Sequence, residues 1–259
     1  MGDGQLTARR WPFLDWDGVI PVAHRGGAAE QPENTMTAFA AAVALGYRYV
    51  ETDVHATSDG VLVAFHDHTL DRVTDRTGVV GELPYDAVRQ ARVGEEPIPL
   101  LEDLLGAWPD LRVHVDAKHL AAAAPLVAAV ERTGARDRVC IGSFSDRTVM
   151  ALRRLSGGRV CTWMGRMEIL ALRLASFGVP VPRSAAGCTQ VPVRQGRLRL
   201  LDQRFVDTAR RRGVGVHAWT INERAQMEAL LDLGVDAILS DRPTVLKQVL
   251  TDRGLWIEA

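Results

Sequence analysis

The feature that most restricts the fold of this chain is a repeated alternation of short β-type runs with amphipathic helical segments. The β-type runs cover residues 21–25, 47–57, 60–67, 111–118, 138–144, 159–164, 188–193, 214–221 and 236–241. The helical segments cover residues 34–46, 122–134, 145–156, 201–213, 222–234 and 242–250. Several begin at Asn, Ser or Asp and stop at Gly, the usual start and stop signals of helices. This order of elements predicts an α/β fold with a parallel sheet.

The number of β-type runs is one more than an eight-stranded barrel can hold. The second and third runs, however, are joined only by Ser-Asp-Gly at 58–60, which suits a hairpin and is too short for a crossover helix. Taking the run at 60–67 as the return arm of that hairpin, we predict a single (β/α)8 TIM barrel with a β-hairpin extension after strand 2. Residues 67–109 are then a long irregular section, with a helix at 100–108, lying over one end of the barrel.

The domain organisation follows from length and the absence of a linker. The chain has 259 residues, a common size for an α/β barrel, and shows no Pro/Gly-rich break in composition. We therefore expect one barrel domain over residues 21–255. Residues 1–20 are expected to form a segment covering the barrel end. The sequence Trp-Pro-Phe-Leu-Asp-Trp at 11–16 is more typical of a segment that covers the end of a barrel than of one that binds a membrane surface.

Composition excludes several classes of protein. The 31 basic and 32 acidic residues give a formal net charge of -1, so nothing indicates a nucleic-acid partner. No stretch approaches the roughly 18 apolar residues of a membrane span, and the N-terminus lacks a signal-peptide core, which predicts a cytoplasmic protein without stable membrane insertion. The three cysteines are not paired as in a zinc site and are expected to be buried apolar residues. The oligomeric state is not indicated.

Charged side chains collect where the predicted strands end. Alternation of strand faces puts Glu51 and Asp53 on one side of their strand, and Asp116 and Lys118 on one side of theirs. In barrel enzymes the reactive residues lie at the C-terminal ends of the strands. The polar or aromatic residues expected at this rim are His24, Arg25, Glu51, Asp53, His66, Asp116, Lys118, Trp219 and Asp241.

Three carboxylates at one mouth would repel each other unless a cation neutralised them. Oxygen-only ligation is the preference of Mg²⁺ and Ca²⁺. We therefore predict one divalent cation, Mg²⁺ or Ca²⁺, with Glu51, Asp53 and Asp116 as its ligands.

The other rim residues indicate the chemistry. His24 and His66 can each gain or lose a proton near neutral pH and could act as general acid and base. Arg25 and Lys118 add positive charge that suits a phosphate-bearing substrate. Together with a divalent ion, these residues predict metal-assisted phosphoryl chemistry.

Motifs along the chain resemble those of the glycerophosphodiester phosphodiesterase family, whose barrels belong to the phospholipase-C-like phosphodiesterase superfamily. The matching stretches, in order, are AHRGGAAEQPENTMTAF, GYRYVETDVHATSDGVLVAFHDHTLDRVTDRTG, IPLLEDLL, HVDAK, HAWTIN and LGVDAILSDRP. They cover nearly the whole chain after about residue 20, and the first is long and specific.

The resemblance implies roles for the rim residues. His24 and His66 would be the catalytic pair, and Glu51 and Asp53 metal ligands. Arg25 would help to bind the phosphate, and Trp219 would line the pocket next to the alcohol part of the substrate. The family usually has Glu in a Glu-x-Lys pattern where this chain has Asp116-Ala117-Lys118. Asp in this place also resembles the sphingomyelinase-D-like phospholipases.

The leading hypothesis is metal-dependent hydrolysis of small glycerophosphodiesters to sn-glycerol 3-phosphate and an alcohol. One alternative is a phospholipase-D-like activity on lysophospholipids or sphingolipids, which needs an apolar trough. The apolar segment 163–187 could line such a trough or form ordinary helix core. Another is a non-catalytic barrel that binds phosphorylated ligands, although binding alone would not require both histidines. The residues leave open which histidine is the base, and whether water or a glycerol hydroxyl is the nucleophile.

Overall fold

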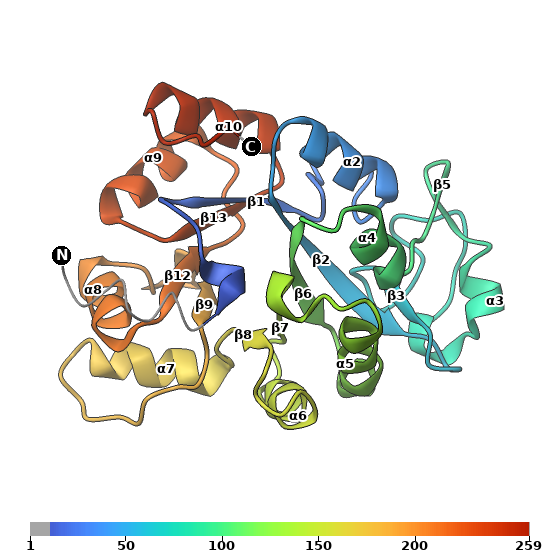
Figure 1. The fold of residues 1–259 in the computed structure, drawn as a ribbon, viewed down its shortest axis with the longest axis horizontal. Helices are drawn as coiled ribbons and strands as arrows, with labels where there is room; N and C mark the ends of the chain where they lie inside the picture. The colour runs from blue at the N-terminus through green and yellow to red at the C-terminus, as the bar shows by residue number, and fades with distance from the viewer. Residues whose placement is uncertain (1–10, 259) are drawn as a thin grey trace.

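The computed structural model describes residues 11–258, so the first half of the predicted N-terminal segment lies outside the described residues. Eight parallel strands follow the sheet order β8-β7-β6-β2-β1-β13-β12-β9. An isolated parallel bridge between Trp163 and Cys188 joins the two edge strands, which closes the barrel drawn in Figure 1. The strands are β1 (Ile20–His24), β2 (Tyr49–Ala56), β6 (Arg112–Ala117), β7 (Val139–Gly142), β8 (Cys161–Thr162), β9 (Cys188–Val191), β12 (Gly215–Ala218) and β13 (Ala237–Ser240).

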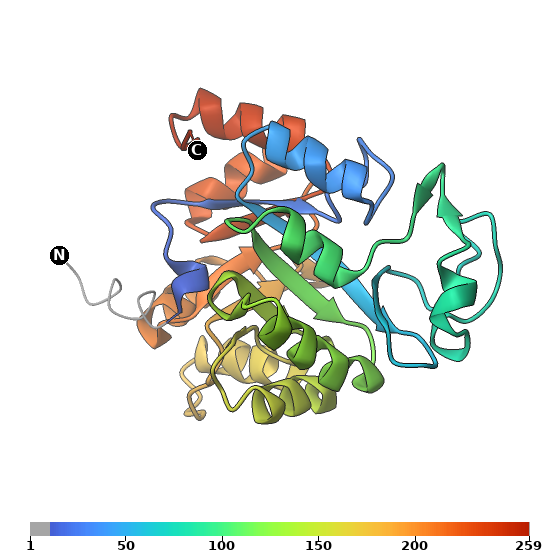
Figure 2. The same ribbon diagram turned by 45° about the vertical axis from the view of Figure 1, so that its right-hand side comes forward.

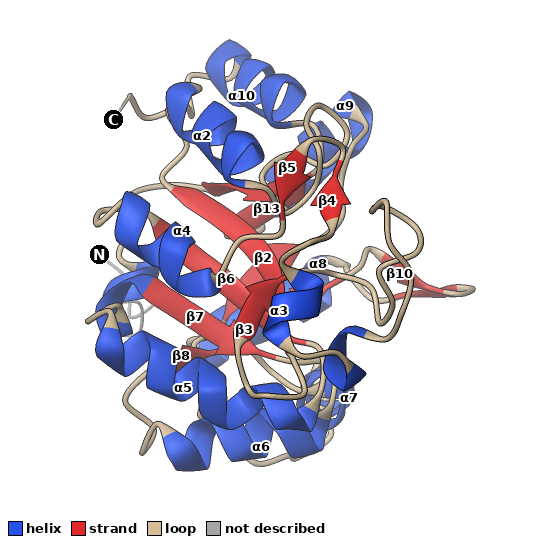
Figure 3. Cartoon of the chain, turned by 90° about the vertical axis from the view of Figure 1, so that its right-hand side faces the viewer, coloured by secondary structure: helices blue, strands red, loops and turns tan. Residues whose placement is uncertain are grey.

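Helices cover the outside of the barrel, and Figure 3 shows α2, α4, α5 and α6 over one part of the sheet. Thr35 and Ser145 cap two of these helices by accepting a backbone N–H, and Gly213 ends another in the left-handed conformation at φ 71°. The helices are α2 (Met36–Ala44), α3 (Tyr85–Val88), α4 (Leu101–Ala107), α5 (Ala123–Arg132), α6 (Asp146–Leu155), α7 (Arg166–Ala175), α8 (Gln203–Arg212), α9 (Arg224–Leu233) and α10 (Pro243–Asp252). Short 3-10 turns are η1 (Pro12–Leu14), η2 (Val80–Glu82), η3 (Leu120–Ala122) and η4 (Arg136–Arg138).

The predicted hairpin after the second barrel strand is present. β3 (Leu62–Ala64) pairs antiparallel with the end of β2. β3 is part of an extension, residues 57–100, which also contains η2, α3 and the short antiparallel pair β4 (Arg92–Val93) and β5 (Glu96–Pro97). This extension has its own apolar cluster, separate from the main core, and Figure 2 shows it projecting to one side of the barrel.

The barrel interior at the N-terminal end of the strands is aromatic and largely apolar. Phe13, in η1, is fully buried and makes edge-to-face contacts with Tyr49 and His114 at ring-centroid distances of 5.3 and 4.7 Å. The Tyr49 hydroxyl donates to the Phe13 carbonyl at 2.7 Å. His114 and His217 are fully buried at this level, 5.1 Å apart between ring centroids, so they lie inside the barrel wall and away from its mouth.

Two local features differ from the sequence expectation. The helix α7 was not among the expected helical segments, and β10 (Arg194–Gln195) and β11 (Leu198–Arg199) form an additional hairpin. The three cysteines are buried free thiols, as expected. Within residues 11–258, none of the helices combines the length and apolarity needed to cross a bilayer.

Candidate active site

A cavity of about 200 Å³ lies at the carboxyl ends of the barrel strands. All eight residues predicted from the sequence as catalytic, metal-binding or substrate-binding line it. Most lie in, end or follow parallel barrel strands, whereas His66 follows the antiparallel strand β3. Three further residues, not predicted, complete the lining. The full set is His24, Arg25, Glu51, Asp53, His66, Asp116, Lys118, Phe144, Gln190, Trp219 and Leu239.

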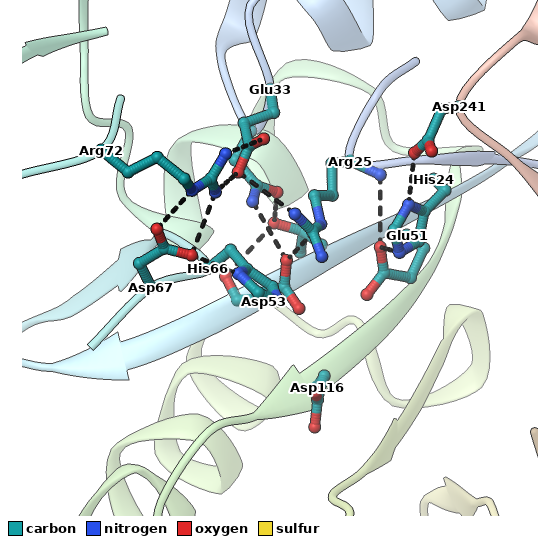
Figure 4. Close-up of polar contacts among 12 residues, drawn as sticks. His24, Arg25, Glu33, Glu51, Asp53, His66, Asp67, Arg72, Asp116 and Asp241 are labelled. Carbon is teal, nitrogen blue, oxygen red and sulfur yellow. Dashed lines mark hydrogen bonds and ion pairs between the residues drawn. The ribbon is translucent and has the colours of Figure 1, made fainter. Parts of the chain in front are cut away.

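Lys118 joins two of the buried carboxylates. The β2–β6 register places Asp53 beside Asp116. The Lys118 Nζ lies 2.5 Å from Asp53 Oδ1 and 2.8 Å from Asp116 Oδ2. On the other side, Arg25 Nε forms an ion pair with Asp53 Oδ2 at 3.1 Å, as seen in Figure 4. The two cations thus hold both oxygens of Asp53.

The loop after β1 turns sharply to bring Arg25 into this position. Arg25 itself has φ 51°, and Gly26 follows at φ 78°. A Cβ on Gly26 would lie 2.7 Å from that of Ala38, so only glycine fits at this turn. The turn lets the Arg25 backbone N–H donate to Glu51 Oε2 at 3.2 Å.

Burial and local charge shift the pKa values of the three carboxyl groups in different directions. Burial, with Asp53 nearby, raises the pKa of Glu51 to about 7 against the opposing charge of His24. Burial likewise raises the pKa of Asp116 to about 6, although Lys118 opposes it. For Asp53 burial would raise the pKa, but Lys118 and Arg25 outweigh it and lower the pKa. Negative charge is therefore best stabilised at Asp53.

His24 is oriented by a carboxylate on the far side of its ring. Its Nδ1 donates to Asp241 Oδ1 at 2.6 Å, and Asn222 donates to the other Asp241 oxygen at 2.8 Å. Its Nε2 faces Glu51 Oε2 at 3.6 Å. Burial would lower the pKa of His24, but Glu51 and Asp241 outweigh burial and raise it.

The ring of His66 is also oriented by a carboxylate, that of the next residue, Asp67. Its Nδ1 donates to Asp67 Oδ1 at 2.5 Å, and its side chain keeps 32% exposure. Burial lowers the pKa of His66, against the charge of Asp53. Each cavity histidine thus has a carboxylate at Nδ1, which fixes the neutral tautomer with Nε2 unprotonated.

Several residues of the site were missed by sequence reasoning. Asn34 donates to Asp53 Oδ2 at 3.2 Å from the loop after β1. The Phe144 ring lies 5.1 Å from the Trp219 ring, between centroids, and Trp219 Nε1 is buried without a hydrogen-bond partner in the described structure. Phe144 stands just beyond β7, so the strand-end rule could have found it. Gln190 lies within β9 and donates to His114 at 3.0 Å, which no sequence pattern indicates.

The carboxylates of the cavity supply donors of the type that a divalent cation prefers. Asp116 Oδ1 is buried and has no hydrogen-bond partner among residues 11–258, and the nearby carboxylates Glu51 and Asp53 supply the oxygen atoms that Mg²⁺ and Ca²⁺ prefer. Within the described residues, no three or more His, Cys, Asp or Glu side chains are arranged around a common point as metal ligands. The oxygen donors thus suit such an ion in type, although Lys118 and Arg25 are paired with both oxygens of Asp53.

Comparison with known proteins gives consistent matches. The model of the family described as "Glycerophosphoryl diester phosphodiesterase family" matches residues 24–245. "Probable glycerophosphodiester phosphodiesterase 2" of Mycobacterium tuberculosis is 41% identical over 252 residues, covering 94% of this chain and 95% of that protein. A lysophospholipase D of Homo sapiens is 26% identical over 267 residues, covering 88% of this chain and 85% of that protein. The crystal structure of a glycerophosphodiester phosphodiesterase from Agrobacterium tumefaciens superposes with a TM-score of 0.75 at 25% identity, covering 88% of this chain and 98% of that one.

Proposed function

Because the chain belongs to the glycerophosphoryl diester phosphodiesterase family, we propose that it hydrolyses small glycerophosphodiesters to sn-glycerol 3-phosphate and an alcohol. One observation carries the proposal: two histidines, each bonded at Nδ1 to a carboxylate, line one cavity together with two cations. Binding alone would need the cations but not two oriented proton-transfer groups, which argues against a non-catalytic barrel.

The histidines are proposed to move the protons of the reaction. With Nδ1 tied to Asp241 or Asp67, the Nε2 of each ring is the atom left to exchange a proton. One Nε2 takes the proton of the nucleophilic hydroxyl as its oxygen bonds to phosphorus. The other histidine enters the step as the imidazolium and gives its Nε2 proton to the leaving alcohol oxygen as the phosphorus–oxygen bond breaks. The nucleophile is water or a glycerol hydroxyl of the substrate, and in the second case water opens the cyclic phosphate in a later step.

Cationic and aromatic side chains are proposed to position the substrate. Arg25 and Lys118 offer donors to the non-bridging phosphate oxygens, where negative charge accumulates. The ring of Trp219 faces Phe144, so the two rings wall one side of the cavity, where the alcohol part would lie.

A divalent cation, Mg²⁺ or Ca²⁺, is proposed to be held by Glu51, Asp53 and Asp116. When bound, it would neutralise the charge of the phosphate and of the three carboxylates. The chain's own contribution is to keep these carboxylates buried. Lys118 pairs with Oδ2 of Asp116, and Oδ1 has no hydrogen-bond partner in the described part of the chain. Asp116 is one methylene shorter than the Glu usual in the family, and the buried carboxylate is nevertheless in place.

The phospholipase-D-like alternative is less well supported by the geometry. It required the apolar segment 163–187 to line the substrate trough. One of its exposed apolar side chains, Met167 on α7, lines a separate cavity of about 250 Å³ that shares no lining residue with the candidate active site. A small polar substrate therefore fits the catalytic cavity better than a lipid chain.

The remaining sequence predictions stay part of the proposal. We propose that residues 21–255 form the catalytic domain and that residues 1–20 cover the barrel end, which the burial of Phe13 supports. The cytoplasmic location also remains a proposal drawn from the sequence.

The function is tested by assaying EDTA-treated protein on glycerophosphocholine and lysophosphatidylcholine, with and without added Mg²⁺ or Ca²⁺. Glycerophosphocholine should be the preferred substrate, and the variants His24→Ala and His66→Ala should each lose activity while keeping a native melting temperature. His68→Ala is the matched control, because His68 is exposed and does not line the cavity. Absence of turnover on every phosphodiester would refute the hydrolase, and a lysolipid preference would favour the alternative.

A further inference from the structure

Arg72 connects two loops at the rim of the candidate active site without lining its cavity. It belongs to the extension of residues 57–100, and its side chain is 50% exposed. Its guanidinium donates to Asp67 through Nε at 2.5 Å and Nη2 at 3.0 Å. It also donates to Glu33 through Nη1 at 3.1 Å and Nη2 at 2.7 Å. One side chain thus bonds both oxygens of two carboxylates, as Figure 4 shows.

Asp67, the first of these carboxylates, is hydrogen-bonded to one of the proposed catalytic histidines. Asp67 Oδ1 accepts the Nδ1 proton of His66 at 2.5 Å. Hydrogen bonding to Arg72 keeps the pKa of Asp67 well below its usual range, so this carboxylate stays ionised and able to accept. With both its oxygens bonded to Arg72, Asp67 has one orientation toward the histidine.

Glu33, the second carboxylate, is hydrogen-bonded to Arg25, which is proposed to bind the phosphate. Glu33 Oε1 also accepts from Arg25 Nη1 at 3.2 Å, and Arg25 Nε pairs with Asp53 at 3.1 Å. Glu33 lies in the loop after β1, whereas Asp67 follows β3. Arg72 therefore ties the extension to the loop that carries Arg25.

We propose that Arg72 is a positioning residue, which fixes the tautomer of His66 through Asp67 and the direction of Arg25 through Glu33. The proposal rests on the proposed function and assigns a role to a residue outside the cavity. The extension packs on its own apolar cluster, so main-core packing does not by itself hold its rim loop in place. Isolated exposed ion pairs contribute little, but a planar guanidinium bonded to two carboxylates gives directional restraint. A lysine ammonium cannot reproduce this geometry.

The test compares Arg72→Gln and Arg72→Lys with a matched control, Arg76→Gln. Arg76 is exposed on the same extension, and no ion pair of its side chain occurs within the described residues. Steady-state kinetics on glycerophosphocholine should show kcat lowered about 10- to 100-fold in Arg72→Gln, the usual range for a residue that orients a reacting group. Arg72→Lys should fall between Arg72→Gln and wild type, and Arg76→Gln should match wild type.

A second readout follows His66 directly and needs no activity. In wild-type protein, ¹⁵N NMR of the imidazole nitrogens should show neutral His66 protonated at Nδ1 alone. In Arg72→Gln the signal should move to a mixture of the two tautomers, while His24, held by Asp241, should not change. A merely structural role for Arg72 would lower the melting temperature without this selective change.

Two further variants distinguish the effect of Arg72 through Asp67 from its effect through Glu33. Asp67→Asn should reproduce the tautomer change and the loss in kcat. Glu33→Gln should mainly raise KM, because Arg25 loses its outer partner. Combining either with Arg72→Gln should give less than the product of the two effects, since the residues act in one network.

The proposal is overturned if Arg72→Gln retains both the His66 tautomer and the kcat of Arg76→Gln. Should Arg72→Gln fail to fold, Arg72→Lys and Asp67→Asn decide the question by the same two measurements. If wild-type protein turns over no glycerophosphodiester, the proposed function fails, and the NMR comparison alone then supports or overturns the positioning role.

Discussion

His24 Nδ1 lies 2.6 Å from Oδ1 of Asp241, a residue 217 positions further along the chain. The contact forms because β1 and β13 are neighbours in the closed barrel, so the ends of the first and last barrel strands meet at the mouth. Asn222 holds the second oxygen of Asp241 and limits its rotation. Closure of the barrel therefore sets the direction in which the His24 ring points.

Replacing Asp241 by Asn should lower kcat by about 100-fold or more, within the usual contribution of general acid–base catalysis, with little change in KM. The amide no longer imposes a proton on Nδ1, so part of the neutral His24 adopts the other tautomer. Steady-state kinetics on glycerophosphocholine measure the effect. Asp252→Asn, at the exposed end of α10, is the control. An Asp241→Asn enzyme with wild-type kcat would contradict this role.

Glu51 should make the metal-free protein less stable as the pH rises. Its pKa is about 7 in the fold against an ordinary value of 4.5, so the folded state holds a proton that the unfolded chain has released between these values. The stabilising contribution is complete below about pH 4.5 and is lost as the pH passes about 7. Relative to wild type, Glu51→Gln should therefore gain about 1–3 kcal/mol of unfolding free energy between pH 5 and pH 8. Urea denaturation in EDTA at both pH values measures it; parallel pH profiles would contradict it.

Asp116 should be needed for metal affinity, with Glu able to replace it. Removing the charge in Asp116→Asn should weaken binding of Mg²⁺ or Ca²⁺ by at least about tenfold, because affinity depends on the number of charged oxygen ligands. Asp116→Glu restores the residue usual in the family and should stay within about threefold of wild type. The shift of melting temperature with metal concentration reports affinity independently of catalysis. Equal shifts in wild type and Asp116→Asn would exclude Asp116 as a ligand.

Phe144 should influence which alcohol the enzyme accepts. Its ring and that of Trp219 form one wall of the cavity, and aromatic faces attract cationic groups such as choline. Phe144→Ala should raise KM for glycerophosphocholine by about 3- to 10-fold. A substrate with an uncharged alcohol should be affected less. Equal effects on both substrates would assign Phe144 to packing alone.

Phe13 should contribute to stability but not to chemistry. It is fully buried at the barrel end opposite the cavity. Phe13→Ala should lower the free energy of unfolding by about 3–5 kcal/mol, the usual cost of such a truncation in a core. The kcat of the folded fraction should not change. Denaturant unfolding with parallel kinetics tests both statements, and a loss below about 1 kcal/mol would show that the segment is a loose cover.

The arrangement of the cavity was predictable where it depends on strand periodicity. Asp53 and Asp116 lie on neighbouring parallel strands in direct register, so face alternation and the strand-end rule suffice to bring them together. Pairings across loops were not predictable in this way. Asp241 was expected at the rim, but its bond to His24 depends on barrel closure. Arg72 lies in an extension whose path follows from its own packing, which no periodic pattern encodes.

The helix α7 shows a different limit of sequence reasoning. Its segment is apolar on several faces, and it starts at Gly165, which offers no side chain to cap the helix. One charged residue in it, Arg173, is nearly buried because it pairs with Asp202 at the start of α8. That partner is 29 residues away, so no local pattern marks this arginine as an inward-facing residue.

Lys118 gives the mouth of the barrel a cation that is part of the chain itself. Its ammonium sits between Asp53 and Asp116, so the repulsion between these two carboxylates is already offset when β2 and β6 come together. Folding of the barrel therefore need not wait for a dissolved ion. A divalent cation bound at these carboxylates would therefore share them with a counterion that belongs to the chain.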